Sequence, residues 1–267
     1  MSYRPSVVLT FAGIDPTGGA GIQADISSQA LVGAHCCPVV TSYTSQDTHN
    51  AYNIYPVNAQ TLENTTRILV RDVRPQAIKI GLLGSSELAS TVANLIRDIR
   101  TDCPQLPIIF DPVLAAGGGT NLSSDQLIDV IRQELLPLCT LITPNTHEAC
   151  RLAENHESAL ASARQLNKDF NLAVLLTGTH DESDTEQVHN RLIHNDQEKT
   201  WSWPRLDGEH HGSGCTLASF CAALLAKGYP LTEALEQAQS LTMNCLSGSY
   251  PIGHGQLIPL RINRTVK

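Results

Sequence analysis

The chain has 267 residues, a length that suits one α/β domain and allows a large hydrophobic core without disulfides or metals. Asp and Glu outnumber Lys and Arg by 26 to 18, and the net charge of −8 argues against nucleic acid or an anionic membrane surface as the main partner. Only five of the cations are lysines. No apolar run approaches the roughly 20 residues that a membrane-spanning helix needs.

The eight cysteines are not arranged as in a small secreted protein. Most lie in apolar runs, such as Cys139 between Leu138 and Leu141, where cysteine behaves as a small hydrophobic residue. The N-terminal residues include no apolar signal segment. We therefore expect free thiols and a cytoplasmic, reducing location.

Along the chain, short apolar runs alternate with amphipathic stretches. We expect strands at residues 6–12, 36–44, 77–83, 107–110, 140–143 and 172–177. We expect helices at residues 18–31, 58–72, 85–100, 123–136, 145–153, 158–166, 214–226 and 232–246. The polar segment 181–202 is expected to be a β-hairpin or a surface excursion. This order predicts one α/β domain over residues 1–267, with a mostly parallel sheet covered on both faces and a ligand site beyond the carboxyl ends of its strands.

The first motif is the glycine-rich segment 13–21, between the first strand and the first helix. Residues 19–24 partly match the dinucleotide pattern G-x-G-x-x-A, but Pro16 interrupts the loop and no acidic residue ends the second strand. Two interpretations remain open, a ligand-binding loop and a turn that lets the helix pack closely. The interpretation as a nicotinamide-dependent oxidoreductase is supported by this weak match alone.

The second motif, residues 211–216, opens the helix at 214–226. A G-x-G turn at a helix start exposes backbone N–H groups at the positive end of the helix dipole, which makes an anion hole without lysine. Cys215 in this position is expected to have a lowered thiol pKa. The alternative is a glycine turn followed by a buried, inert cysteine.

The third motif is Asn145 with Glu148, directly after the strand at 140–143. The pair suits Mg²⁺, which prefers oxygen ligands, and it equally suits a capping box at a helix start. The pattern alone favours the capping box, and both interpretations can be true together. The sequence has neither a P-loop nor a G-x-S-x-G elbow, and the pair His210 and His211 has no partners for structural zinc.

Six segments occur in a fixed order: AGIDPTGGAGIQAD (12–25), SQDT (45–48), IKIGLL (78–83), DPV (111–113), LITPNTHE (141–148) and HGSGCTL (211–217). Together they resemble the hydroxymethylpyrimidine/phosphomethylpyrimidine kinases of thiamine biosynthesis, in the ribokinase-like superfamily. The resemblance covers roughly residues 6–256. It implies a three-layer α/β/α sandwich with a mostly parallel central sheet. It also implies that ATP with Mg²⁺ phosphorylates 4-amino-5-hydroxymethyl-2-methylpyrimidine, a small-molecule substrate, and then its monophosphate.

The resemblance also implies roles for individual residues. Those expected at the pyrimidine are Gly13, Asp25, Thr44, Gln46, Leu82 and Val113, with Gln46 at the ring edge. The expected catalytic set is Cys215, as proton acceptor, with Gly212, Ser213 and Gly214 as the anion hole. The residues expected at the nucleotide and its cation are Asn145, Glu148, Thr177, Gly178 and Asp111, with Asp111 and Glu148 at the metal.

Two positions depart from the family pattern. Thr177 stands where the family usually has lysine, and Gly117–Gly119 stand where it commonly has K-S-G. Lys79 or an arginine could compensate, or the three glycines could bring N–H groups to a phosphate. A pyridoxal-type vitamin kinase and a catalytically weakened pyrimidine-binding regulatory module therefore remain alternatives, and a homodimer is the default assembly.

Overall fold

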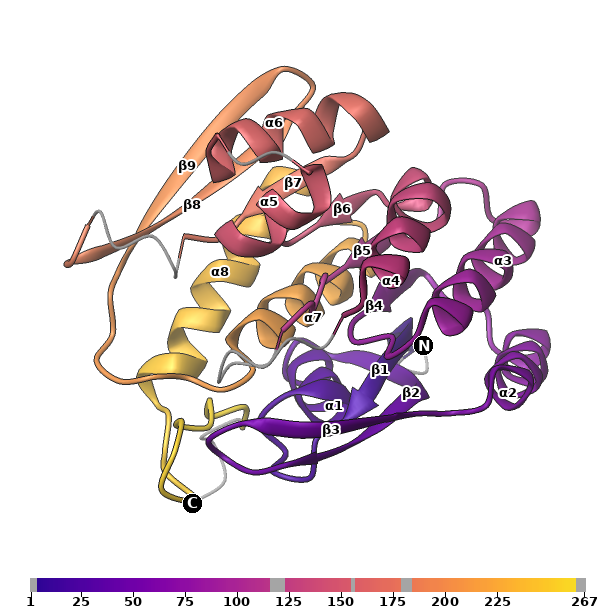
Figure 1. Cartoon of the computed structure of the whole chain (residues 1–267), viewed down its shortest axis with the longest axis horizontal. Coiled ribbons are helices and arrows are strands. Elements are labelled where there is room, and N and C mark those ends of the chain that lie inside the picture. Colours follow the sequence, from indigo (N-terminus) through magenta and orange to yellow (C-terminus); the bar gives the residue numbers. More distant parts are fainter. Residues whose placement is uncertain (1–3, 116–122, 155–156, 179–183, 263–267) are drawn as a thin grey trace.

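The computed structural model describes residues 4–115, 123–154, 157–178 and 184–262 (Figure 1). Its strands are β1 (Ser6–Ile14), β2 (Ala34–Gln46), β3 (Ala51–Pro56), β4 (Ala77–Ile80), β5 (Ile108–Phe110), β6 (Leu141–Ile142), β7 (Ala173–Leu176), β8 (Gln187–His194) and β9 (Gln197–Pro204). Its helices are α1 (Gly21–Leu31), α2 (Ala59–Asp72), α3 (Ser86–Asp102), α4 (Asp125–Val130), α5 (Thr146–Ala153), α6 (Ala159–Phe170), α7 (Ser213–Ala226) and α8 (Leu231–Ser247). A π turn, η1 (Ile131–Leu135), and a 3-10 turn, η2 (Leu136–Leu138), follow α4.

All nine strands belong to one sheet in the order β3-β2-β1-β4-β5-β6-β7-β8-β9. The six strands from β2 to β7 in this order pair in parallel, while β3 at one edge and β8 and β9 at the other are antiparallel. The expected mostly parallel sheet is thus confirmed. The carboxyl ends of its central strands lie along one edge of the sheet, where the ligand site was predicted.

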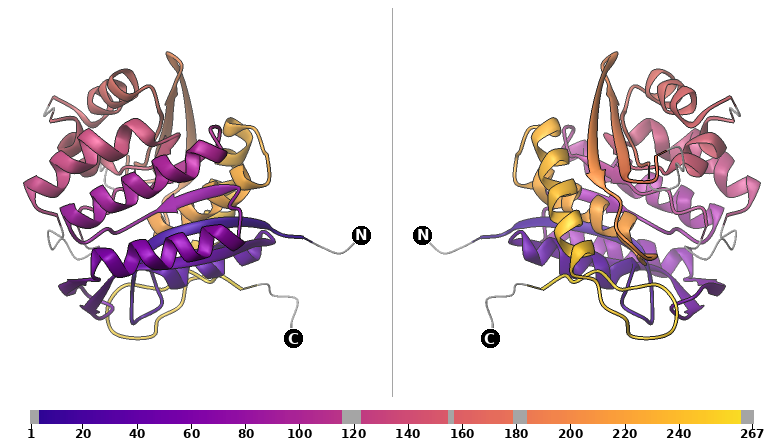
Figure 2. Two further views of the ribbon diagram at one scale, coloured as in Figure 1. Left: turned by 90° about the vertical axis from the view of Figure 1, so that its right-hand side faces the viewer. Right: turned by 90° about the vertical axis from the view of Figure 1, so that its left-hand side faces the viewer.

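Helices cover both faces of the sheet and give three layers (Figure 2). Helices α2 to α6 pack on one face, in a core cluster that includes Leu62, Ile96, Leu152 and Leu166. Helices α7 and α8 pack on the other face around Phe220, beside α1. The expected α/β/α sandwich is confirmed. Helix α7 is buried nearly all round because it lies between the sheet, α1 and α8.

Side-chain caps explain where several helices begin. Asn58 accepts a hydrogen bond from Thr61 N at the start of α2, as its sequence position predicts. Ser85, Ser124 and Ser158 cap α3, α4 and α6 in the same way. Helix α7 differs, since its N-cap is Gly212, which has no side chain to cap the first N–H groups. Those groups stay available to a ligand.

The structure departs from the expected elements in three places. The edge strand β3 was not predicted. The helix expected at 123–136 is α-helical only over α4 and continues as the π turn η1. The 3-10 turn η2 then ends it at Pro137, which lacks the N–H that a continuing helix needs. Helix α1 begins at Gly21 rather than Gly18, since Asp15 accepts hydrogen bonds from Gly18 N and Ala20 N and holds the loop before it.

The cysteines are all free, as expected. Four of them, Cys37, Cys139, Cys221 and Cys245, are buried. Cys36, Cys103, Cys150 and Cys215 are only partly buried, so the cysteines behave as core residues at half of their positions. Within the described residues, no helix is both long and apolar enough to cross a membrane.

Phe220 provides a test of the α7 packing. Its side chain is fully buried between α7, α8 and the sheet, so Phe220→Ala should lower the free energy of unfolding by about 3–5 kcal/mol. Ile68→Ala on α2, where the side chain is 68% exposed, should change it by less than about 0.5 kcal/mol. Urea unfolding measures both, and equal losses would contradict the described core.

Candidate active site

A cavity of about 750 Å³ lies at the carboxyl ends of the parallel strands. Most of the residues expected at a site from the sequence line it. They are Gly13, Thr44, Gln46, Leu82, Asp111, Val113, Asn145, Glu148, Thr177, Gly212, Ser213, Gly214 and Cys215. Asp25 and Gly178 are not among the lining residues. The expected nest at Gly117–Gly119 lies outside the described residues.

Asp25 does not line the cavity itself but forms an ion pair with Lys79, which does. Asp25 and Lys79 are both fully buried, and Lys79 Nζ lies 3.0 and 3.1 Å from the two carboxylate oxygens. Ser219 Oγ donates to Asp25 as well. Burial alone would lower the pKa of Lys79, but Asp25 raises it above its ordinary value, so Lys79 is charged. A cation in the apolar run of β4 thus lies at the cavity wall.

The start of α7 lies against the first glycine loop. Gly212 has a left-handed backbone with φ +75°, and a Cβ there would lie 1.9 Å from Gly19 O. Only glycine fits that approach. The next three residues, Ser213, Gly214 and Cys215, line the cavity with their helix-start N–H groups uncapped by any side chain. This arrangement suits an anion.

Cys215 is partly buried at the same helix start. Burial raises the pKa of its thiol to about 12, the nearby Asp111 adds to the rise, and Lys79 opposes it. The expectation of a lowered thiol pKa is therefore wrong for the ligand-free site. Loss of hydration and a neighbouring carboxylate outweigh the favourable helix start.

Asn145 and Glu148 form the expected capping box at the start of α5. Asn145 Oδ1 accepts from Glu148 N, and Glu148 Oε2 accepts from Asn145 N, both at 2.9 Å. Burial, followed by the Asp111 carboxylate, raises the pKa of Glu148 to about 8. Burial also raises the pKa of Asp111, whose Oδ2 has no hydrogen-bond partner within the described chain. Two close, poorly solvated carboxylates favour a cation between them.

A bound cation would need further ligands. No group of three or more His, Cys, Asp or Glu that could hold a metal occurs in the parts of the chain that the structure describes. Asp111 and Glu148 therefore make an open pair rather than a closed protein cage. This donor set fits Mg²⁺, which keeps several waters and binds substrate phosphates.

The other end of the cavity is formed by β8, β9 and α8, across the sheet from β2. Its apolar side chains are Val188, Trp203, Leu206, Met243 and Leu246, and its polar ones include Asn190, Arg205, Gln239 and Thr242. Gln239 Oε1 accepts from Trp203 Nε1 and from Asn190 Nδ2, both at 3.0 Å. Asn190 Oδ1 in turn accepts from Gly178 N, so Gly178 supports this end from behind. None of the α8 residues belongs to a sequence motif.

Arg261 was also missed. Its buried guanidinium donates to Gly18 O, Gly19 O and Gly212 O at 3.4, 2.5 and 3.4 Å, and to Thr216 Oγ1 at 2.9 Å. It therefore joins the first glycine loop to the start of α7. No motif surrounds it, and only its three-dimensional contacts reveal the role.

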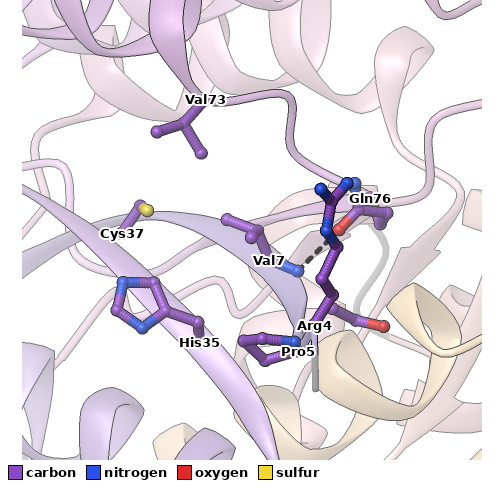
Figure 3. Close-up of a pocket in the computed structure, with 8 residues that line it drawn as sticks. Arg4, Pro5, Val7, His35, Cys37, Val73 and Gln76 are labelled. Carbon is purple, nitrogen blue, oxygen red and sulfur yellow. Dashed lines mark hydrogen bonds between the residues drawn. The ribbon is translucent and has the colours of Figure 1, made fainter. Parts of the chain in front are cut away.

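A second hollow of about 580 Å³ lies at the amino ends of β1 and β2 (Figure 3). Arg4, His35 and Cys37 line it, and Gln76 Oε1 accepts from Val7 N at 2.6 Å. None of the expected site residues takes part. The chemistry is concentrated at the opposite ends of the strands.

Comparison with known proteins agrees with this geometry. The ADP complex of Bacillus subtilis pyridoxal kinase has the same fold, with a TM-score of 0.83 at 25% identity over 94% of this chain and 95% of that one. Fold and site together define a small-molecule kinase of the ribokinase-like class. The family model "Phosphomethylpyrimidine kinase" matches residues 15–260, and the chain belongs to this family.

Two relatives are named hydroxymethylpyrimidine/phosphomethylpyrimidine kinase. The Mycobacterium tuberculosis protein is 36% identical, over 96% of this chain and 94% of its own length. The Streptomyces coelicolor protein is 34% identical, over 94% and 92%. Both alignments span nearly the whole of each chain, so the family resemblance extends over every part of the cavity.

Arg261→Met tests the junction of the two loops. The change leaves buried carbonyl groups unpaired, so we expect unfolding free energy to fall by about 2–4 kcal/mol. We also expect kcat, measured at a temperature where the variant is folded, to fall at least about tenfold with a smaller change in KM, because the anion hole loses its support. Arg164→Met, which removes an exposed pair with Glu198, is the control and should cost under about 1 kcal/mol. Wild-type kcat in folded Arg261→Met would remove this residue from the positioning role.

Proposed function

We propose that the protein transfers the γ-phosphoryl group of ATP to the hydroxymethyl group of 4-amino-5-hydroxymethyl-2-methylpyrimidine, and then to the resulting monophosphate, in thiamine biosynthesis. One observation carries the proposal. The uncapped start of α7 lies within a cavity that has a polar end at Thr44 and Gln46 and an apolar end at Trp203 and Met243. An anion hole between two unlike binding regions suits transfer of a phosphoryl group between two substrates.

The polar end suits the pyrimidine. Gln46 offers both an N–H donor and an oxygen acceptor, which an aminopyrimidine ring edge needs. Leu82 and Val113 offer apolar contacts to the faces of the ring. We place the adenine of ATP at the other end, where Trp203, Leu206 and Met243 supply apolar surface.

The middle of the cavity suits the transferred group. The N–H groups of Ser213, Gly214 and Cys215 are aligned before reaction, so they stabilise charge on the phosphoryl oxygens without rearranging. Lys79 adds a buried positive charge at the cavity wall. Thr177 and Gly117 stand where the family pattern has lysines. Lys79 supplies one positive charge to the cavity from a different strand.

Asp111 and Glu148 would hold Mg²⁺, because their poorly solvated carboxylates and the unpaired Asp111 Oδ2 fit an oxygen-binding cation. When bound, Mg²⁺ neutralises charge on the nucleotide phosphates. Asn145 fixes the Glu148 carboxylate through its backbone N–H. Thr177 N is bonded to Pro144 O, which holds the end of β7 beside this pair.

Cys215 remains our candidate for the group that meets the substrate hydroxyl. In the ligand-free site its thiol is protonated at neutral pH and donates rather than accepts a hydrogen bond. Lys79 favours the thiolate and Asp111 disfavours it, so the balance of these two charges governs whether Cys215 accepts the hydroxyl proton. Phosphoryl transfer needs little base assistance early in the reaction, which makes a weakly populated thiolate sufficient.

A pyridoxal-type kinase on the same fold is the second candidate. The likeness to Bacillus subtilis pyridoxal kinase favours it, and the Cys215 thiol at the cavity wall could add to an aldehyde.

We further infer one kinase domain over residues 1–267, since a single sheet connects both ends of the described chain. The homodimer and the cytoplasmic location stay predictions.

A coupled assay of ADP release tests the function. With ATP and Mg²⁺ we expect turnover on the pyrimidine alcohol and on its monophosphate, and kcat/KM for pyridoxal at least about tenfold lower. A preference for pyridoxal would support the second candidate. Binding of the pyrimidine without any turnover would instead support the regulatory module.

Cys215→Ala tests the hydroxyl-facing role. We expect kcat to fall at least about 100-fold while the protein stays folded and KM for ATP changes little. Cys150→Ala is the matched control, because Cys150 is also partly buried but lies on α5 outside the cavity lining. Steady-state kinetics with circular dichroism measure both variants. Unchanged kcat in Cys215→Ala would remove this residue from the chemistry.

A further inference from the structure

A chain of polar contacts crosses the end of the cavity beside β2. His211 Nε2 lies 2.8 Å from Asp15 Oδ2 and 3.2 Å from Gln46 Nε2. At its other side, Gln46 Oε1 lies 3.0 Å from Thr44 Oγ1, which lies 2.9 Å from Ile14 O. All five residues line the cavity. The two ends of this chain decide which way the Gln46 amide faces.

The first end is fixed by Asp15, which is 3% exposed. Burial acts to raise the pKa of Asp15, but hydrogen bonds from His211 and Thr17 outweigh it and hold the pKa at about 2. An ionised carboxylate only accepts hydrogen bonds, so the proton of the short contact lies on His211 Nε2. This holds for neutral and for protonated imidazole. A protonated Nε2 has no lone pair for a Gln46 N–H. The amide oxygen is the compatible atom beside it, because it can share the Nε2 proton with Asp15 as the longer branch of a forked bond.

The second end gives the same answer independently. Ile14 O can only accept, so Thr44 uses its single hydroxyl proton there. Toward Gln46 the Thr44 oxygen is then an acceptor, and it requires the amide NH₂ group. A half-turn about the last side-chain bond of Gln46 exchanges oxygen and nitrogen at nearly the same positions and satisfies both ends.

We propose that Asp15 and His211 are positioning residues that fix the Gln46 amide with its oxygen toward His211 and its NH₂ toward Thr44, so that Gln46 selects an amino-substituted ring edge. This inference rests on the proposed function and explains how the site recognises its substrate class. The fixed amide has one N–H and one oxygen lone pair left for a ligand. A ring nitrogen accepts the first, and an exocyclic amino group donates to the second.

A ring that presents oxygen acceptors at this edge is disfavoured. Its acceptor would face the Gln46 oxygen, and the amide cannot turn without breaking its contacts with His211 and Thr44. A site built to bond a polar group discriminates strongly, because a mismatched ligand leaves buried groups unpaired. His211 is held for this task by its backbone N–H, which donates to Leu257 O at 2.9 Å, and by Gly19, where a Cβ would lie 2.3 Å from the imidazole.

Four variants test the inference. His211→Leu removes the donor, and Thr44→Val removes the acceptor at nearly constant shape. Each should raise KM for the pyrimidine alcohol about tenfold, change kcat less than about threefold, and lower the inhibition constant of pyridoxal, because the released amide can turn toward an oxygen acceptor. His211→Gln places an N–H near the same position and should recover most of the lost KM. His194→Leu, on β8 outside the cavity lining, is the control and should behave as wild type.

A second measurement needs no substrate. Nitrogen NMR of the ligand-free protein should show His211 protonated at Nε2, with that signal altered in Asp15→Asn. An unprotonated Nε2, or equal KM values for His211→Leu and His211→Gln, would overturn the inference. Absence of turnover on the pyrimidine by the wild-type protein would instead contradict the proposed function, and the NMR result would still decide the orientation of Gln46.

Discussion

The site depends on the contact between two glycine loops that are far apart in the sequence. Gly212 approaches Gly19 so closely that no side chain fits between them, and Arg261 joins their carbonyl groups. This contact sets the start of α7 beside the end of β1. From it follow the position of His211 against Asp15 and the place of Cys215 in the cavity. Loss of this contact would separate the anion hole from the pyrimidine end.

The buried charged groups of the cavity wall include more carboxylates than nearby cations can stabilise. Lys79 is paired with Asp25 and acts on Asp111, and Arg151 acts on Glu148, but burial outweighs both cations and keeps the pKa values of the two carboxylates raised. Their raised pKa values measure the cost of keeping them ionised in a poorly hydrated place. A bound cation, alone or together with a phosphate, would stabilise the ionised forms of these carboxylates. Burial and the Asp111 carboxylate also raise the pKa of the Cys215 thiol.

Local sequence signals predicted most of the fold and much of the site, because they act within a few residues. The cap at Asn58 and the box of Asn145 with Glu148 are of this kind. Helix α7 and the lining role of residues 212–215 followed from a glycine turn before an apolar helix. The thiol pKa of Cys215 and the placing of Asp25 were not predictable, since both depend on Lys79 and Asp111 from other strands. Arg261 and β3 likewise depend on distant partners.

The bond between Arg261 and Gly18 spans 243 positions of the sequence. During synthesis, β1, β2 and β4 can pair long before this arginine leaves the ribosome, but the two glycine loops stay unjoined. Contacts of such long sequence separation form late and slow the completion of folding. A chain that has not yet been synthesised to residue 261 therefore lacks the arginine that joins the two glycine loops.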